Sequence, residues 1–299
     1  MIGLSKKPLI SIIINCYNGE KFLRNAVISV LSQTYKNWEI IFFDNSSNDE
    51  SKNIFLSFDD KRLRYFYSKK KLNLYHARNK AIKKAKGDFI SFLDVDDWWE
   101  KNNLNSRKDF FVKNSYSFSY SNCYFYFEKK KKKKLFSNQK LPSGYIFDAL
   151  CKKYLVNLST IIIRRIFLSK LTYIFDKKYN VIGDFELILR LSEKYLVHST
   201  NASLVNIRYH QENFSRLNRA LYYKEYKNWW NKIKNVDKYK NYRSIFLKKL
   251  KYLEIIKDLI KFKNFIILKK IVNYPFCYDK IKLLIIFLMP KHFYNYFYK

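Results

Sequence analysis

Glycine, proline and cysteine are scarce in this sequence of 299 residues, which contains five glycines, four prolines and four cysteines. No glycine-rich phosphate loop is present near the N-terminus, where Asn15–Gly19 is the only candidate turn. The cysteines form no close pair at metal-ligand spacing, which argues against a cysteine-based metal site. They are Cys16, Cys123, Cys151 and Cys277.

Targeting and membrane-spanning segments are also missing from the sequence. The first residues pass from Lys6 and Lys7 directly into a strand-like run, without a secretory signal. The longest uninterrupted apolar run, Leu283–Met289, is far shorter than the roughly 20 residues that a transmembrane helix needs. We therefore expect a reduced, cytoplasmic protein that does not cross a membrane.

Acidic residues are few, with 25 Asp and Glu against 59 Lys and Arg, a formal net charge of +34. This charge favours polyanionic partners such as nucleic acid, an anionic lipid surface or phosphorylated substrates. Part of the excess can reflect drift toward lysine, because the abundant Lys, Asn, Ile, Tyr and Phe have AT-rich codons. The run Lys129–Lys134 indicates an exposed, mobile loop, with a lipid-facing role as the alternative.

The first hundred residues alternate between short apolar runs and segments with helical spacing. This alternation predicts βαβ units and a parallel sheet, and ligands bind at the carboxyl ends of such strands. Polar residues at Asn15–Asn18, Asp44 and Asp94–Asp97 should therefore meet at one edge. The expected strands are Leu9–Ile14, Trp38–Phe43, Arg64–Tyr67 and Phe89–Leu93, and the expected helices are Phe22–Leu31, Glu50–Phe58 and His76–Lys86, the last capped by Gly87.

Beyond the first hundred residues the pattern is less regular. Tyr116–Phe127 and Leu158–Arg164 are predicted strands, and Gly183–Tyr195 is a predicted helix. From residue 216 the sequence changes to helical stretches dense in Lys, Tyr, Phe and Ile. Residues 216–299 hold 21 Lys and Arg against 5 Asp and Glu, a net charge of +16. We therefore expect two domains, 1–215 and 216–299.

Asp94-Val95-Asp96-Asp97 is the most informative motif. Carboxylates at positions i and i+2 just past a buried strand can hold Mg²⁺ or Mn²⁺ and leave coordination positions for diphosphate oxygens. Such a metal acts as a Lewis acid on a departing nucleotide diphosphate. The alternative is an acidic turn that only caps the following segment.

The order of elements resembles the family 2 glycosyltransferases, densely over residues 8–100 and at a few points over 101–215. The resemblance implies an inverting bacterial cell-envelope enzyme with a GT-A, Rossmann-like α/β fold: a mostly parallel sheet flanked by helices, with a C-terminal helical appendage. Residues 1–215 would be the catalytic domain. The matching segments are Ile10–Gly19, Ser29–Tyr35, Trp38–Ile41 leading to Asp44, Ala77–Ala81, and Ala85–Ile90 leading into Asp94–Asp97.

The resemblance also implies roles for single residues in a nucleotide-sugar site. Asp44 would accept a hydrogen bond from uracil, although Asn45-Ser46-Ser47 replaces the acid and glycine that follow it in many relatives. Asp94 would lie near the ribose or sugar, and Asp96 would bind the metal. The remaining expected contacts are Arg78 to the diphosphate, and Asn15 and Tyr17 in the loop beside the nucleotide.

A catalytic base is expected in Gly183-Asp184-Phe185-Glu186, which resembles the acidic segment of the family. An inverting displacement needs a carboxylate that takes the proton of the acceptor hydroxyl. Asp184 is the expected base and Glu186 the fallback, whereas the alternative for Asp184 is capping of the helix N-terminus. His210 is expected to contact the diphosphate or complete the metal shell, or else to be structural.

The basic, aromatic tail predicts peripheral contact with an anionic membrane, on its inner face. Interleaved lysines and aromatic rings suit the headgroup region, and Lys280–Lys299 is the best candidate segment. The alternative is an ordinary helical appendage that packs on the catalytic domain. Trp98 and Trp99 are expected either to stack on a sugar ring or to anchor the core.

These expectations combine into one function. It is the transfer of a single sugar from a nucleotide-sugar donor, with UDP expected, to a hydroxyl of a glycan or lipid-linked acceptor, with Mg²⁺ or Mn²⁺ as cofactor and no nucleic acid as partner. The alternatives are a nucleotidyltransferase, a catalytically inactive relative that acts as a binding partner, and a basic nucleic-acid-binding protein, for which no recognition motif is visible. A processive synthase is disfavoured by the lack of transmembrane helices.

Overall fold

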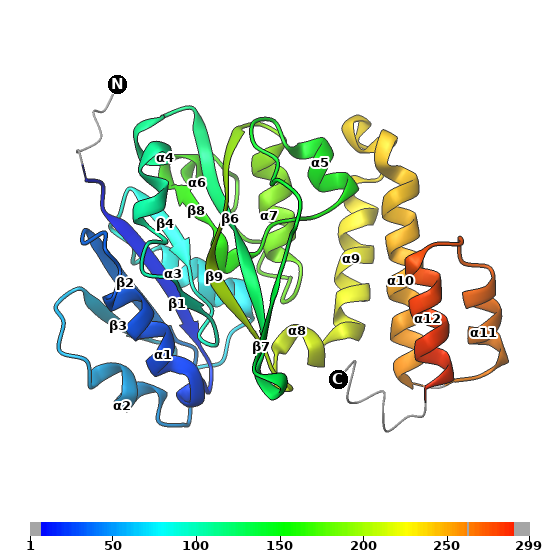
Figure 1. The fold of residues 1–299 in the computed structure, drawn as a ribbon, viewed down its shortest axis with the longest axis horizontal. Helices are drawn as coiled ribbons and strands as arrows, with labels where there is room; N and C mark the ends of the chain where they lie inside the picture. Colours follow the sequence, from blue (N-terminus) through cyan, green and yellow to red (C-terminus); the bar gives the residue numbers. More distant parts are fainter. Residues whose placement is uncertain (1–6, 262, 290–299) are drawn as a thin grey trace. The chain divides into compact units, whose positions relative to one another are not determined.

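The computed structural model describes residues 7–261 and 263–289, and the chain divides into two compact units, residues 1–209 and 210–299 (Figure 1). The first unit contains one sheet with the strand order β3-β2-β1-β4-β8-β6-β9-β5, and β7 pairs with β6. Its strands are β1 (Ile10–Cys16), β2 (Trp38–Asp44), β3 (Leu63–Tyr67), β4 (Phe89–Phe92), β5 (Trp98–Trp99), β6 (Tyr116–Phe127), β7 (Lys132–Leu135), β8 (Ile162–Arg164) and β9 (Leu196–Tyr209). Its helices are α1 (Glu20–Leu31), α2 (Ser51–Leu56), α3 (Leu74–Ile82), α4 (Lys108–Val112), α5 (Phe147–Lys152), α6 (Arg165–Ser169) and α7 (Gly183–Ser192), with short 3₁₀ turns η1 (Asn105–Arg107), η2 (Glu128–Lys130) and η3 (Leu158–Thr160).

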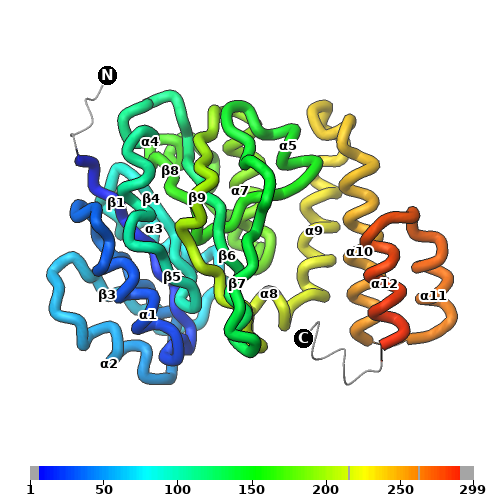
Figure 2. Tube along the Cα trace, viewed as in Figure 1, coloured from blue at the N-terminus to red at the C-terminus, as the bar shows by residue number. Residues whose placement is uncertain are grey.

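The four strands expected in the first hundred residues are present and run parallel in the order β3-β2-β1-β4. Beyond β4 the pairing is mixed. β8 runs antiparallel to β4 and β6, β5 runs antiparallel to β9, and β6 and β9 run parallel and side by side (Figure 2). The expected mostly parallel sheet is therefore confirmed, with antiparallel pairs confined to the part after β4, where the regular strand–helix alternation of the sequence ends.

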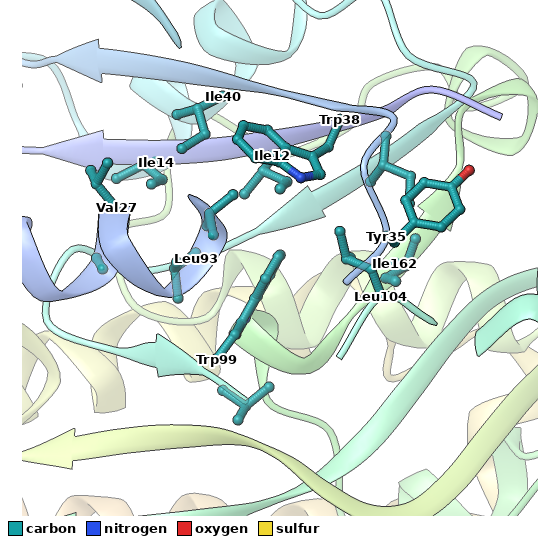
Figure 3. Packing of buried hydrophobic residues seen from close by; sticks show 14 of the residues in the cluster. Ile12, Ile14, Val27, Tyr35, Trp38, Ile40, Leu93, Trp99, Leu104 and Ile162 are labelled. Carbon is teal, nitrogen blue, oxygen red and sulfur yellow. The ribbon is translucent and has the colours of Figure 1, made fainter. Parts of the chain in front are cut away.

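The two faces of the first half of the sheet are covered by different helices. Ile12 and Ile14 of β1 face α1 and belong to a buried cluster with Val27 (Figure 3). On the opposite face, the ring of Phe92 lies 5.7 Å from that of Phe175, which in turn lies 5.0 Å from the ring of Tyr75 in α3. This second face leads to the carboxyl edge of the strands, where α3 begins.

Gly87 does not cap α3, contrary to expectation. The helix already ends at Ile82, with Lys83 as its C-cap, and Gly87 does not have the positive φ of a left-handed cap. Gly87 instead lies against the backbone of β1. A Cβ atom there would lie 2.6 Å from the nitrogen of Ser11 and 2.7 Å from the oxygen of Leu9.

We expect Gly87→Ala to destabilise the protein by about 1–3 kcal/mol, because the added methyl group meets backbone atoms that cannot move aside. Thermal unfolding of the variant should therefore show a lower Tm than the wild type. An unchanged Tm would contradict the close approach of the backbone at this position.

The lysine run after β6 forms a hairpin rather than the expected loop. Lys132–Leu135 pairs antiparallel with β6, and the turn is closed by Lys131, whose φ is +48°. Lysines on an edge strand discourage pairing with other chains, which gives this run a structural role. The run is exposed, as expected, over Lys129–Lys134.

The second unit is helical. Its elements are α8 (Phe214–Leu217), α9 (Arg219–Ile233), the 3₁₀ helix η4 (Asp237–Tyr242), α10 (Arg243–Lys261), α11 (Phe265–Val272) and α12 (Tyr278–Leu288). The helices α10, α11 and α12 enclose a small core that includes Ile255, Ile271 and Leu283. No helix in residues 7–261 and 263–289 is long and apolar enough to cross a membrane. All four cysteines are free thiols.

Candidate active site

The candidate site lies at the carboxyl edge of β1, β2 and β4, where the expected polar residues meet. The loops that leave these strands hold one another in place. The N–H of Asn45 donates to the oxygen of Cys16 at 2.8 Å, and the N–H of Asn18 donates to the Ser47 hydroxyl at 3.0 Å. A Cβ atom on Gly19 would lie 2.7 Å from a methyl group of Val95, so the DVDD turn packs directly on the start of α1.

Asp44 ends β2 with both carboxylate oxygens oriented by donors. The N–H of Ser47 donates to Oδ1 and the Tyr65 hydroxyl donates to Oδ2, each at 2.8 Å. Burial and this hydrogen bond together raise the pKa of Tyr65, so the phenol stays a donor. Asp44 is only 1% exposed, and a carboxylate has further lone pairs that could accept a ligand N–H.

Asn15 and Tyr17 flank the end of β1. Neither the nitrogen nor the oxygen of the Asn15 amide has a hydrogen-bond partner within the part of the chain that the structure describes, although both atoms are buried. Unpaired buried polar atoms cost free energy, so this amide is suited to bind a polar ligand. Tyr17 is 43% exposed, and the Nζ of Lys71 lies 3.3 Å from the centre of its ring.

The three carboxylates of the acidic turn after β4 have different surroundings. Asp97 is 4% exposed, accepts from the Ser159 hydroxyl at 2.7 Å and from the N–H of Arg208 at 2.9 Å, and so fastens η3 and β9 to the turn. Burial, followed by the charges of Asp96 and Asp94, raises the pKa of Asp97 well above its usual range. Asp97 is therefore structural, which leaves Asp94 and Asp96 for ligands.

Arg78 and Asp184 join this cluster from α3 and α7. Arg78 forms an ion pair with Asp94, and the Tyr75 hydroxyl donates to Oδ1 of Asp184 at 2.7 Å. Burial lowers the pKa of Arg78, but the charge of Asp94, with those of Tyr75 and Asp184, outweighs it and raises that pKa. Four of the predicted site residues therefore act on one another: Arg78, Asp94, Asp96 and Asp184.

The start of α7 is shaped to present Asp184. A Cβ atom on Gly183 would lie 2.5 Å from the ring of Tyr75, so only glycine lets the helix begin this close to α3. Glu186, the fallback base, is 4% exposed and bound to Arg190 at 2.7 Å and to the Tyr173 hydroxyl at 2.8 Å. These contacts engage Glu186 in the fold and favour Asp184 as the base.

Sequence reasoning missed Arg208 and Tyr75. The Nε of Arg208 donates to the main-chain oxygen of Asp96 at 2.9 Å, and its guanidinium carbon lies 4.7 Å from the ring centres of Trp98 and Phe22. Its cationic group thus holds the turn that carries Asp96.

The two tryptophans of β5 have structural surroundings. Trp99 is 3% exposed, lies in the main core (Figure 3), and donates from Nε1 to the oxygen of Ser159 at 3.0 Å. Trp98 packs edge-on against Tyr126 at 5.3 Å. Trp99 therefore anchors the core, which settles the two alternatives for this residue.

The side chains of the site can be compared with the ligands that a divalent metal prefers. No group of three or more His, Cys, Asp and Glu side chains in residues 7–261 and 263–289 is arranged to hold a metal ion. Asp96 nevertheless offers hard carboxylate oxygens at a partly exposed position, which fits an ion that also takes oxygens from a diphosphate. His210 is 8% exposed and its N–H donates to Oδ1 of Asn213 at 2.7 Å. It belongs to the second unit, so its role as a metal ligand stays a prediction.

Comparison with known proteins agrees with this geometry. The profile of glycosyl transferase family 2 matches residues 11–172. The chain is 30% identical over 222 residues to the Escherichia coli UDP-Glc:α-D-GlcNAc-diphosphoundecaprenol β-1,3-glucosyltransferase WfgD, covering 74% of this chain and 84% of that protein.

Two solved structures share the fold. One is Staphylococcus aureus TarS 1–349 in complex with UDP-GlcNAc, with a TM-score of 0.53 and 14% identity over 93% of this chain and 89% of that one. The other is the mannosyltransferase PcManGT of Pyrobaculum calidifontis in complex with GDP-Man and Mn²⁺, with a TM-score of 0.59 and 13% identity over 93% and 79%.

The mixed α/β sheet flanked by helices has the GT-A type of fold, as expected, and the carboxylates of the site lie at the carboxyl edge of its parallel strands. The chain belongs to glycosyl transferase family 2.

Proposed function

We propose that this glycosyltransferase moves one sugar, with inversion, from a UDP-sugar to a hydroxyl of a lipid-linked or glycan acceptor in cell-envelope polysaccharide synthesis. Residues 1–215 would form the catalytic domain. The carrying observation is the placement of Asp184 beside Tyr75, Arg78 and Asp94 at the carboxyl edge of the sheet. The name of the E. coli relative, which specifies UDP-Glc and a diphosphoundecaprenol-linked sugar, supports the donor and the acceptor.

Each residue of the candidate site has a role in the proposed reaction. Asp184 takes the proton of the acceptor hydroxyl as its oxygen bonds to the anomeric carbon, and the bond from that carbon to the diphosphate oxygen breaks. Arg78 and Asp94 orient the donor, Asn15 and Tyr17 contact the nucleotide, and Asp44 accepts from uracil. Asp96 would hold Mg²⁺ or Mn²⁺ together with diphosphate oxygens, and the ion supplies Lewis-acid stabilisation of the leaving diphosphate.

The stereochemistry of the product tests this proposal. The protein is incubated with Mn²⁺, UDP-glucose and a synthetic GlcNAc-diphospholipid, and the anomeric configuration of the product is determined by NMR. A β-linked product from the α-linked donor supports the single displacement. An α-linked product would contradict it, and if UDP-glucose is not transferred, other UDP-sugars and then GDP- and dTDP-sugars become the next donors to test.

We also propose that the second unit contacts an anionic membrane from the cytoplasmic side. Residues 216–299 carry a net charge of +16, and large apolar side chains are exposed in α11, α12 and their connection, including Phe265 at 77% and Phe276 at 85%. In the expected segment Lys280–Lys299, residues 290–299 lie outside the described residues. Within α12, Leu283 is in the core, whereas Ile285 and Leu288 are exposed.

Phe276→Ser is expected to weaken binding to phosphatidylglycerol-containing vesicles by about tenfold, because one large apolar side chain no longer enters the interface. Flotation on a density gradient measures this partition. Tyr145→Ser is the matched control, since Tyr145 is a similarly exposed aromatic residue of the first unit, at 77% against 85% for Phe276. Equal loss in both variants, or flotation of neither variant nor wild type, would contradict membrane contact through the second unit.

A further inference from the structure

A basic cavity lies in the first unit, between the edge strand β3 and the C-terminal part of α3. Its volume is about 710 Å³. Five lysines line it: Lys69 and Lys70 just after β3, Lys80 in α3, and Lys83 and Lys84 just after α3. The carboxylates of the candidate active site do not line it, so its chemistry is separate from theirs.

The positive charge of this cavity is not neutralised by neighbouring acids. In residues 7–261 and 263–289, no carboxylate forms an ion pair with any of the five lysines, and the nearby acid Glu39 is bound to Arg64 at 2.7 Å. The pKa of His76, on the same helix, reflects the nearby positive charge. Burial lowers the pKa of His76, and the charges of Lys80, Lys177 and Lys83 lower it further.

The wall of the cavity is apolar and held in place. Phe66 contributes an aromatic ring whose centre lies 5.4 Å from the Nζ of Lys84, and Phe43 is its partner in the sheet register. Leu72 is fixed by the side chain of Asn45, which accepts from its N–H and donates to its oxygen, each at 2.9 Å. Cations beside an apolar wall match a ligand that joins a phosphate group to an apolar or ring-bearing group.

We infer that this cavity, which we call the lysine pocket, binds the phosphate group of an amphipathic organic phosphate. Lysine ammonium groups donate charge-assisted hydrogen bonds to the phosphate oxygens, and the attached group packs on the ring of Phe66. A soluble nucleotide and a phospholipid headgroup share this chemistry. The pocket is a site additional to the proposed donor site and does not depend on it.

The test compares two triple variants with equal loss of charge. One is Lys80→Gln, Lys83→Gln and Lys84→Gln in the pocket. The other is Lys113→Gln, Lys152→Gln and Lys153→Gln, which are exposed elsewhere on the first unit. ADP binding is measured by calorimetry in EDTA, so that metal-dependent binding at Asp96 does not contribute. Flotation is measured with phosphatidylcholine vesicles with and without phosphatidylglycerol.

If the lysine pocket binds a soluble organic phosphate, the affinity for ADP should fall by about tenfold or more in the pocket variant and stay unchanged in the control variant. A lipid headgroup predicts that only the pocket variant loses flotation with phosphatidylglycerol, whereas ADP does not bind the wild type. Equal losses in both triple variants, or no loss in the pocket variant, would overturn the inference and reduce the lysines to general surface charge. UDP binding with Mn²⁺, measured on the same variants, reports separately on the donor site.

Discussion

Replacing Asp184 with asparagine is expected to lower the rate of sugar transfer by about 10²–10⁴-fold while UDP binding stays unchanged. Asparagine keeps the oxygen that accepts from Tyr75 at 2.7 Å, so the start of α7 should keep its position against α3. The amide cannot take a proton from the acceptor hydroxyl. Single-turnover transfer from a radiolabelled UDP-sugar, together with calorimetric UDP binding, separates the two effects.

Asp148→Asn is the matched control for the alternative that Asp184 only caps its helix. Asp148 is also an acid in the first turn of a helix, α5. Loss of such an acid costs about 0.3–1 kcal/mol of helix stability in either place. If both variants lose similar stability and both keep transfer, Asp184 is a cap and another carboxylate must serve as base.

The strands that build the site could be predicted from the sequence because nearly all of their residues are buried. β1, β2 and β4 are apolar runs in which Asn15 is the only residue that is not fully buried. Such short runs of β-branched and aromatic residues are typical of a strand that is covered on both faces of the sheet. The predicted strand ends also predicted where Asp44 and Asp94 lie, because Asp44 is the last residue of β2 and Asp94 comes just after β4.

Secondary structure was harder to predict from the sequence where an element is only half-buried. β9 mixes polar and apolar residues, and its register with β6 shifts at Ser121, Asn122 and Cys123, so neither a period of two nor a helical period is clear. The expected strand Leu158–Arg164 is wrong in its first half. Asn157 caps a 3₁₀ turn there, which brings the Ser159 hydroxyl to Asp97.

The partners of the site residues could not be predicted, since they come from distant parts of the chain. Tyr75 and Asp184 are 109 positions apart, and Arg208 and Asp96 are 112 apart. Local spacing carries no information on such pairs. The resemblance to a known family predicted roles for Asp184 and Arg78, whereas the contacts of Tyr75 and Arg208 needed the three-dimensional arrangement.

Asp96→Asn is expected to abolish the dependence of UDP binding on Mn²⁺. In the wild type, an ion shared between Asp96 and the diphosphate should tighten UDP binding by about tenfold or more, since hard carboxylate oxygens are preferred ligands. An amide is a weaker ligand without charge, but the turn should persist, because Arg208 donates to the Asp97 carboxylate and to the main-chain oxygen of Asp96, and the Ser159 hydroxyl also donates to Asp97. Calorimetry of UDP with Mn²⁺ and with EDTA measures the effect.

Asp109→Asn controls for the loss of one negative charge, since Asp109 is an exposed acid of α4 in the same unit. It should leave the metal dependence intact. Metal-dependent binding that survives in Asp96→Asn would move the metal to other ligands. If the wild type binds UDP equally well in EDTA, Arg78 and Arg208 become the groups that neutralise the diphosphate, because they are the cations that already lie against the DVDD turn.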